Sequence, residues 1–157
     1  MRSADNTNER EFTRFVKETE PRLSYALAAA YGIDVGAEAT ADALAWAWEN
    51  WSKVETMKNP AGYLYRVGQS KARRYFRPVV LFPALPALEA PGVDPDLHIA
   101  LANLSKNQRV AAVMVHGLGY SEREVADLLG ISRWSVRTHA ERGLSKLKSA
   151  LEVKIDV

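Results

Sequence analysis

Apolar positions in this chain recur at intervals of three and four residues over most of its length. This spacing places apolar side chains on one face of a helix, and no useful run shows the alternation of a strand. The pattern predicts helices over residues 8–31, 35–53, 59–77, 98–103, 105–116, 121–129 and 132–152. We therefore expect an all-α protein without internal repeats.

Residues 78–97 interrupt the helical pattern with five of the seven prolines of the chain. Proline fixes its own backbone and biases the residue before it toward extended conformations, so we expect an extended linker. The segment is unusually apolar for a linker, and it could pack on its own domains or lie in the groove of a partner. The sequence thus predicts two small helical domains, 1–77 and 98–157, joined by the Pro-rich linker 78–97.

The C-terminal domain carries clear helix start and stop signals. Ser105 and Ser121 each precede a Gln or Glu by three residues, which is the spacing of a capping box. Gly130 ends the second of these helices, and Ser132 caps a third. A short helix, a tight turn after glycine and a longer helix form a helix-turn-helix, whose second helix enters the major groove of DNA. Its expected buried stripe is Val136, Ala140, Leu144, Leu147 and Leu151.

The remaining faces of this predicted recognition helix are basic and polar. Arginine can bind guanine with two hydrogen bonds or grip a phosphate, and hydroxyl side chains contact either more weakly. The alternative is a three-helix module with a merely solvated basic face. The candidate DNA contacts are Ser132, Arg133, Trp134, Ser135, Arg137, Thr138, His139 and Arg142.

Residues 59–77 combine arginines with aromatic residues. Asn59 is placed to cap this helix, and Pro60 occupies its first turn. Aromatic rings beside arginines suit single-stranded nucleic acid, because bases stack on the rings while the cations follow the backbone. The alternative is a basic surface helix whose aromatic residues belong to the core. The candidate contacts are Tyr63, Arg66, Ser70, Arg73, Arg74 and Arg77.

The preceding helix contains three tryptophans. Leu44, Trp48 and Trp51 share a face that we expect in the core, whereas Trp46 lies on another side. An exposed tryptophan among polar groups can anchor a protein contact, and packing of Trp46 on another helix is the alternative. The polar groups near it are Asp42, Glu49 and Asn50.

Together these motifs resemble the extracytoplasmic-function (ECF) group of bacterial RNA polymerase sigma factors, in the sigma-70 family. The pattern of region four appears as L-S-x-x-Q-R-V at 104–110, G-Y-S-E-R-E-V-A-D-L-L-G-I-S at 119–132 and S-V-R-T-H at 135–139. The match to region two is looser and uses EFTRFVKETEPRL, EATADALAWAWENW and NPAGYLYRVGQSKARRYFR. The resemblance extends from about Phe12 to Leu151.

The resemblance implies a function in transcription initiation. Region two would bind core RNA polymerase through Asp42, Trp46, Glu49 and Asn50, and would melt and hold the minus-ten element through the aromatic and basic residues of 59–77. Region four would read the minus-thirty-five element. The implied partners are core RNA polymerase and promoter DNA, both as duplex and as single non-template strand. An anti-sigma factor is a further partner that is common in the family.

Five sites depart from the family pattern, and they concern promoter sequence and polymerase affinity rather than architecture. Ala41 stands for a glutamine, Trp46 for an arginine, Ser70 for an asparagine, Trp134 and Ser135 for Gly-Thr, and Ser105 for a proline.

Composition and charge narrow the function further. The net charge of +2 divides into +2 over residues 1–77, −3 over 78–98 and +3 over 99–157, so two basic modules flank an acidic segment. The chain has no cysteine, its three histidines are isolated, and no apolar run approaches the roughly 20 residues of a membrane span, so we expect a cytoplasmic protein without metal or cofactor. No enzyme motif is visible. The alternative function is a LuxR-like transcription regulator, because GISRWSVRTH also resembles that DNA-binding domain.

Overall fold

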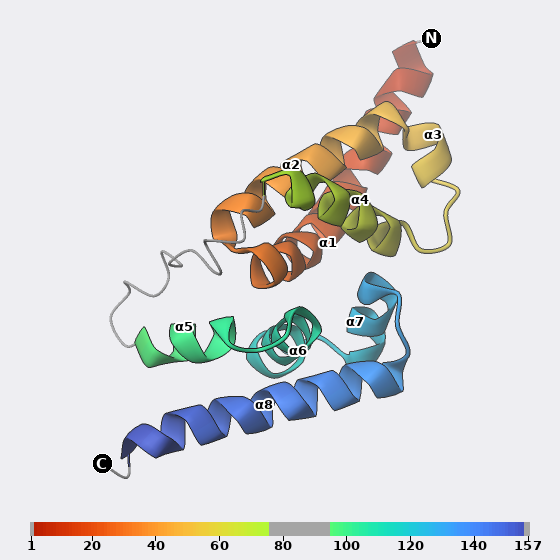
Figure 1. The fold of residues 1–157 in the computed structure, drawn as a ribbon. Helices are drawn as coiled ribbons and strands as arrows, with labels where there is room; N and C mark the ends of the chain where they lie inside the picture. Colours follow the sequence, from red (N-terminus) through yellow and green to blue (C-terminus); the bar gives the residue numbers. More distant parts are fainter. Residues whose placement is uncertain (1, 76–94, 156–157) are drawn as a thin grey trace.

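The computed structural model describes residues 2–75 and 95–155, and within them all regular elements are helical (Figure 1). The all-α prediction is therefore confirmed. The elements are α1 (Arg2–Tyr31), α2 (Ile33–Glu49), α3 (Trp51–Val54), α4 (Pro60–Tyr75), α5 (Pro95–Ala102), α6 (Lys106–Ala111), the π-helical turn η2 (Ala112–Gly117), α7 (Glu122–Leu129) and α8 (Arg133–Ile155).

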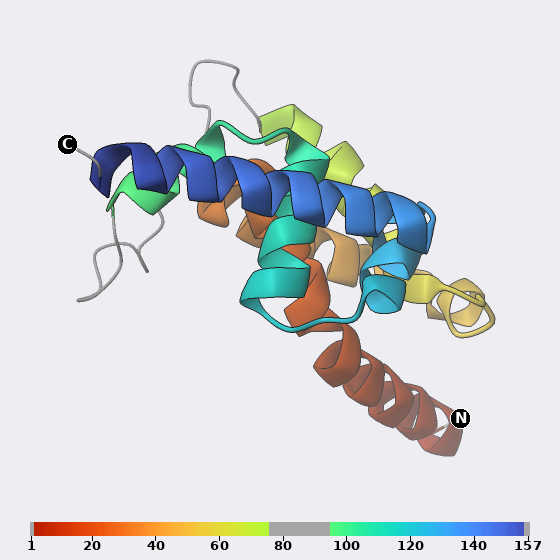
Figure 2. The same ribbon diagram turned by 90° about the horizontal axis from the view of Figure 1, so that it is seen from below.

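Several helix bounds differ from the predicted ones. Helix α1 begins six residues earlier than expected and extends away from the rest of the molecule (Figure 2). The predicted helix 35–53 is interrupted at Asn50, whose backbone N–H and side-chain Nδ2 both donate to the carbonyl oxygen of Trp46. Helix α5 starts at Pro95 and not at residue 98, because the first turn of a helix tolerates proline. Residues 76–94 lie outside the described residues, and with them Arg77 and positions 78–94 of the predicted linker. The last positions of that linker, 95–97, were expected to be extended but form the start of α5.

The N-terminal unit is built from α1, α2 and α4, with α3 after the break. Helices α1 and α2 approach closely because position 36 is glycine: a Cβ there would lie 2.6 Å from the backbone nitrogen of Ala28. Alanines fill most of the remaining contact, and Leu23, Leu27 and Leu64 are completely buried. The unit therefore depends on small residues at its helix crossings.

The expectation that Trp48 lies in the core is wrong. Its side chain is 45% exposed and covers one side of an aromatic cluster with Phe12, Phe15 and Trp51. The ring centroid of Phe12 lies 5.0 Å from that of Trp48 and 5.4 Å from that of Trp51. Trp48 and Trp51 do share a side, because both rings contact Phe12 of α1, but this contact leaves Trp48 half exposed.

The C-terminal unit contains the predicted helix-turn-helix in α7 and α8. Both capping boxes are present, and the C-cap Gly130 adopts the left-handed conformation with φ 69° that ends α7. Val125, Leu128, Val136 and Ala140 are buried between the helices. The outer part of the expected stripe, from Leu144 to Leu151, is only partly buried.

The two units pack on each other, and a buried arginine connects them. The guanidinium of Arg109, on α6, donates two hydrogen bonds to the end of α1. Its Nε donates to the carbonyl oxygen of Ala29, and its Nη2 donates to that of Ala30 at 2.9 Å. These carbonyls belong to the last turn of α1 and have no intrahelical partner, so a buried cation there satisfies them and complements the helix dipole. A third bond from Nη1 reaches Leu104 in its own unit.

The surroundings of this arginine are apolar and aromatic. Arg109 is 7% exposed, and burial lowers its pKa while the hydroxyl of Tyr65 raises it. Burial also raises the pKa of Tyr65, as does the neighbouring Tyr31. The ammonium of Lys106 lies 5.6 Å from the ring centroid of Tyr31, a second cation from α6 against the end of α1.

We predict that Arg109→Met separates the two units. The change leaves two buried carbonyls of α1 without donors, so the free energy of unfolding should fall by about 3 kcal/mol. Because the chain has no cysteine, labels on cysteines introduced at the exposed positions Ala37 and Ser149 can report the distance between the units. The control is Arg123→Met, which changes an exposed arginine of α7. An unchanged distance distribution in the Arg109 variant would show that other contacts hold the units together.

Candidate nucleic-acid interface

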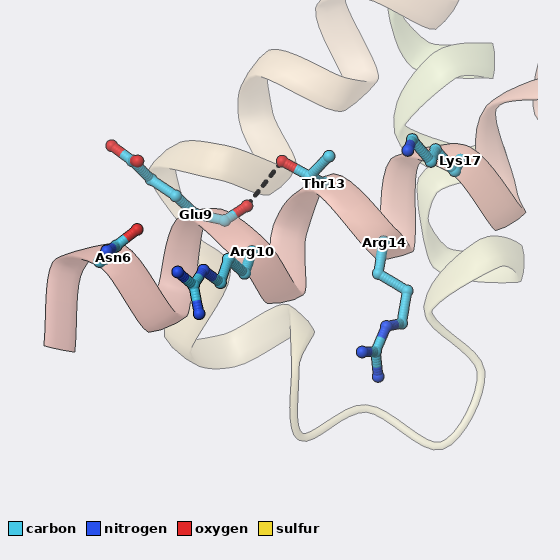
Figure 3. Close-up of a pocket in the computed structure, with 6 residues that line it drawn as sticks. All are labelled: Asn6, Glu9, Arg10, Thr13, Arg14 and Lys17. Carbon is cyan, nitrogen blue, oxygen red and sulfur yellow. Dashed lines mark hydrogen bonds between the residues drawn. The ribbon is translucent and has the colours of Figure 1, made fainter. Parts of the chain in front are cut away.

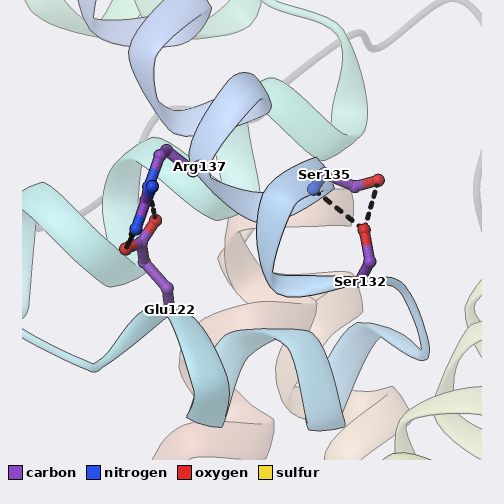
Figure 4. A network of polar contacts seen from close by, with 4 residues as sticks. All are labelled: Glu122, Ser132, Ser135 and Arg137. Atoms are coloured by element: carbon purple, nitrogen blue, oxygen red, sulfur yellow. Dashed lines mark hydrogen bonds and ion pairs between the residues drawn. The ribbon is translucent and has the colours of Figure 1, made fainter.

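The first turn of α8 is fixed by the serine that precedes it. The Oγ of Ser132 accepts from the backbone N–H of Ser135 at 3.0 Å and donates to the Oγ of Ser135 at 2.9 Å (Figure 4). The predicted cap is thus confirmed. The hydroxyls of Ser132 and Ser135, both predicted to contact DNA, therefore already take part in hydrogen bonds within the protein.

The predicted contact residues of α8 divide by exposure. Trp134 is 71% exposed, the highest value among the large apolar side chains described. Arg133, Arg137 and Arg142 are exposed as well, whereas Ser135, Thr138 and His139 are partly buried. The arginines and the tryptophan therefore offer most of the surface that could contact DNA.

Arg137 forms an ion pair with Glu122, the first residue of α7. Its Nε lies 2.9 Å from Oε2, and its Nη2 lies 3.0 Å from Oε1, so the pair is bidentate (Figure 4). The hydrogen bond holds the pKa of Glu122 below, and that of Arg137 above, its ordinary value. Sequence analysis did not single out Glu122, because fifteen residues and the turn at Gly130 separate the partners.

Helix α4 begins at the predicted cap and presents the predicted basic face. The Oδ1 of Asn59 accepts from the backbone N–H of Gly62 at 3.1 Å. Tyr63 is 42% exposed, and its ring centroid lies 5.3 Å from that of Trp46. This contact partly buries Trp46, so Trp46 packs on another helix, which was the alternative to an exposed protein-contact anchor. The exposed polar residues of this helix are Arg66, Ser70, Arg73 and Arg74.

The predicted polymerase-binding residues of α2 are only partly available. Glu49 is exposed, whereas the side-chain amide of Asn50 is bound to the carbonyl oxygen of Trp46. The Oδ2 of Asp42 accepts from the hydroxyl of Tyr75 at 3.3 Å, and the charge of Asp42 raises the pKa of that hydroxyl. Asp42 therefore has a neighbour from the end of α4 that the sequence pattern did not indicate.

The helix-turn-helix lies directly against α4. The Nδ2 of Asn59 donates to the carbonyl oxygen of Asp127, on α7, at 2.7 Å. A Cβ at Gly62 would lie 2.6 Å from the same oxygen, and one at Gly130 would lie 3.0 Å from the Nη2 of Arg66. A cavity of about 200 Å³ at this contact is lined by residues of both units, among them Tyr63. One end of the candidate minus-ten surface is thus occupied by the turn between α7 and α8.

Sequence reasoning missed this contact between units. Asn59 and Asp127 are 68 positions apart, and Arg109 and Ala29 are 80 apart, so no local pattern joins them. Arg109 ends the polar stretch of residues 105–109, so its neighbours in the sequence give no sign that it is buried.

A second hollow lies along the extended start of α1 (Figure 3). It has a volume of about 400 Å³, and all of its lining residues come from this one helix. Arg10, Arg14 and Lys17 project beside it, and the hydroxyl of Thr13 donates to the carbonyl oxygen of Glu9 at 2.7 Å. One helix cannot enclose a ligand, so we regard this as an open basic surface.

Among residues 2–75 and 95–155, no group of three or more potential metal-ligating side chains lies close together. None of the helices in the described part of the chain combines the length and the apolar character that a membrane crossing requires.

One family model matches most of the C-terminal unit. Residues 96–147 match the family described as Sigma-70, region 4. No curated protein sequence matches the chain.

Two solved structures share the fold over nearly the whole chain. The sigma factor RpoE from Bartonella quintana, solved with the anti-sigma factor NepR, has 19% identity and a TM-score of 0.67, covering 92% of this chain and 98% of its own. CnrH, solved with the cytosolic domain of CnrY, has 23% identity and a TM-score of 0.62, covering 96% of this chain and 94% of its own. The similarity in fold therefore includes the N-terminal unit, which lies outside the residues 96–147 that the family model matches.

We predict that Gly62→Ala weakens the contact between α4 and α7. The added Cβ collides with the carbonyl oxygen of Asp127 and with the Asn59 side chain, so the free energy of unfolding should fall by about 2 kcal/mol. The matched control is Gly117→Ala, where a Cβ meets no atom within 4 Å. Denaturant titration of both variants measures the difference. Equal free energies of unfolding for the two variants would show that the close approach of Gly62 to Asp127 does not contribute to stability.

Proposed function

We propose that the chain serves as a sigma factor, because residues 96–147 match the Sigma-70 region 4 family and the fold is similar to that of the sigma factor RpoE over nearly the whole chain. It binds core RNA polymerase and directs it to promoters by recognising a minus-thirty-five and a minus-ten element. The chain itself then carries out no bond-forming chemistry, which belongs to the polymerase.

The observation that carries this proposal is the pairing of a helix-turn-helix with an N-terminal unit of the sigma-factor fold. The exposed arginines and Trp134 at the start of α8 suit an element read in the major groove. A helix-turn-helix alone would equally support a simple DNA-binding regulator. The N-terminal unit favours the sigma-factor role, because the similarity in fold to the sigma factor RpoE includes it.

The N-terminal unit supports recognition of the minus-ten element. Helix α4 presents arginines beside the half-exposed Tyr63, a combination that suits an unstacked single strand. Flipping a base out of the duplex costs a few kcal/mol, which stacking and pocket contacts offset. Asp42 and Glu49 on α2 are the acidic groups proposed to contact the polymerase.

The packed arrangement differs from the one needed at a promoter. Positions minus ten and minus thirty-five are about 25 base pairs apart, which is about 85 Å along B-DNA. Helices α4 and α7 are instead in hydrogen-bond contact through Asn59 and Asp127. The two units must therefore separate when both elements are bound.

An inhibitory protein partner is part of the proposal. RpoE was solved with the anti-sigma factor NepR, and CnrH with the cytosolic domain of CnrY. By analogy, a partner of this class would hold the chain away from the polymerase.

We predict that the purified chain binds core RNA polymerase and that the complex initiates at specific sites on genomic DNA. The chain alone should bind promoter duplex only weakly, because the packed units cannot reach both elements. Co-purification, followed by mapping of transcript 5′ ends, measures both effects. DNA binding without any association with the polymerase would favour the LuxR-like alternative.

Arg142→Ala should weaken binding of the polymerase complex to promoter duplex by roughly 1–3 kcal/mol if Arg142 contacts a base. The control is Arg14→Ala, which removes an exposed arginine from α1. Titrations on cognate and mismatched duplexes separate the cases. A loss of equal size on every duplex would reassign Arg142 to a phosphate contact.

A further inference from the structure

Two acidic side chains lie near Arg137, but only one of them binds it. Glu122, from α7, accepts three N–H···O contacts of 2.9–3.3 Å from its guanidinium. Glu141, one turn further along α8, raises the pKa of Arg137 through its negative charge but does not form a hydrogen bond with it. The carboxylate of Glu122 is thus the group that sets the orientation of this arginine.

The pairing leaves one edge of the guanidinium available. Arginine has five N–H groups, and Glu122 engages the Nε–H and one N–H of Nη2. The outer edge, formed by Nη1 and the second N–H of Nη2, keeps two parallel donors. The side chain is 58% exposed, so this edge is accessible to a ligand.

The position of the carboxylate is itself fixed by the fold. Glu122 is the first residue of α7, where the capping box of Ser121 and Glu124 orders the backbone. Val125 on α7 and Val136 on α8 are fully buried, so core packing fixes the position of α7 relative to α8. Arg137 is therefore oriented before DNA arrives, which lowers the entropy cost of binding.

We propose that Glu122 is a positioning residue that orients Arg137 to read a guanine in the minus-thirty-five element. The inference rests on the proposed function. Two parallel donors match the O6 and N7 acceptors of guanine, which is the commonest specific contact of arginine in the major groove. A phosphate is a poor alternative ligand, because the Glu122 carboxylate lies 2.9 Å from the Nε of Arg137. Its negative charge repels a phosphate and partly neutralises the guanidinium.

The test uses the full chain with core RNA polymerase and a promoter library whose minus-thirty-five region is randomised. Sequencing of the transcripts gives the preference for each base at each position. The wild type should prefer guanine at one position, and Arg137→Ala should reduce that preference by about tenfold. Glu122→Gln should reduce it at the same position, while total output stays level or rises, because a charge that repels phosphate is lost.

Two further variants separate positioning from general charge and from stability. Glu141→Gln removes a nearby negative charge without touching the hydrogen bonds of Arg137, so its base preference should match the wild type. Arg137→Lys keeps the charge but lacks the planar fork, so it should lose the guanine preference. Thermal melting of each variant shows whether it is folded at the assay temperature.

The outcomes distinguish a failure of the proposed sigma-factor function from a failure of the positioning role of Glu122. A wild-type complex that initiates nowhere in the library would overturn the proposed function, and this inference with it. Selective initiation with an unchanged guanine preference in Glu122→Gln would overturn the inference alone. The same holds if Glu141→Gln lowers the preference as much as Glu122→Gln does.

Discussion

The arrangement of the two helical units depends on one buried cation. Arg109 fills a position that an apolar side chain could not fill, because the last carbonyls of α1 need donors and lie away from water. Its third bond, to Leu104, anchors the same guanidinium in the C-terminal unit. These bonds are directional, so they specify one orientation of the units, while buried apolar side chains of both units form one continuous core beside them.

The two candidate DNA surfaces are affected differently by this arrangement. The start of α8 remains exposed, with Trp134 and three arginines open to solvent. The candidate surface on α4 is partly covered, because the turn at Gly130 lies against Arg66. The packed form therefore leaves the surface proposed to bind duplex DNA exposed and partly covers the surface proposed to bind a single strand.

Local features could be predicted from the sequence, and long-range ones could not. Both capping boxes, the Asn59 cap and the helix-turn-helix follow from residues within a few positions of one another, and the structure confirms them. The expected burial of Trp48 was wrong: Trp48 packs on Phe12 of α1 but stays 45% exposed, and helical periodicity alone does not show how far another helix covers a side chain. The Arg109 contact and the pair of Glu122 with Arg137 depend on tertiary packing, which helical periodicity does not encode.

Asn59 links local folding to domain association. Its Oδ1 caps α4, and its Nδ2 binds the carbonyl oxygen of Asp127, so one side chain takes part in both events. Fixing its rotamer for either bond lowers the entropy cost of the other. Helix initiation in one unit and docking of the other are therefore thermodynamically cooperative, and a ligand that pulls the units apart also loosens the first turn of the helix proposed to hold melted DNA.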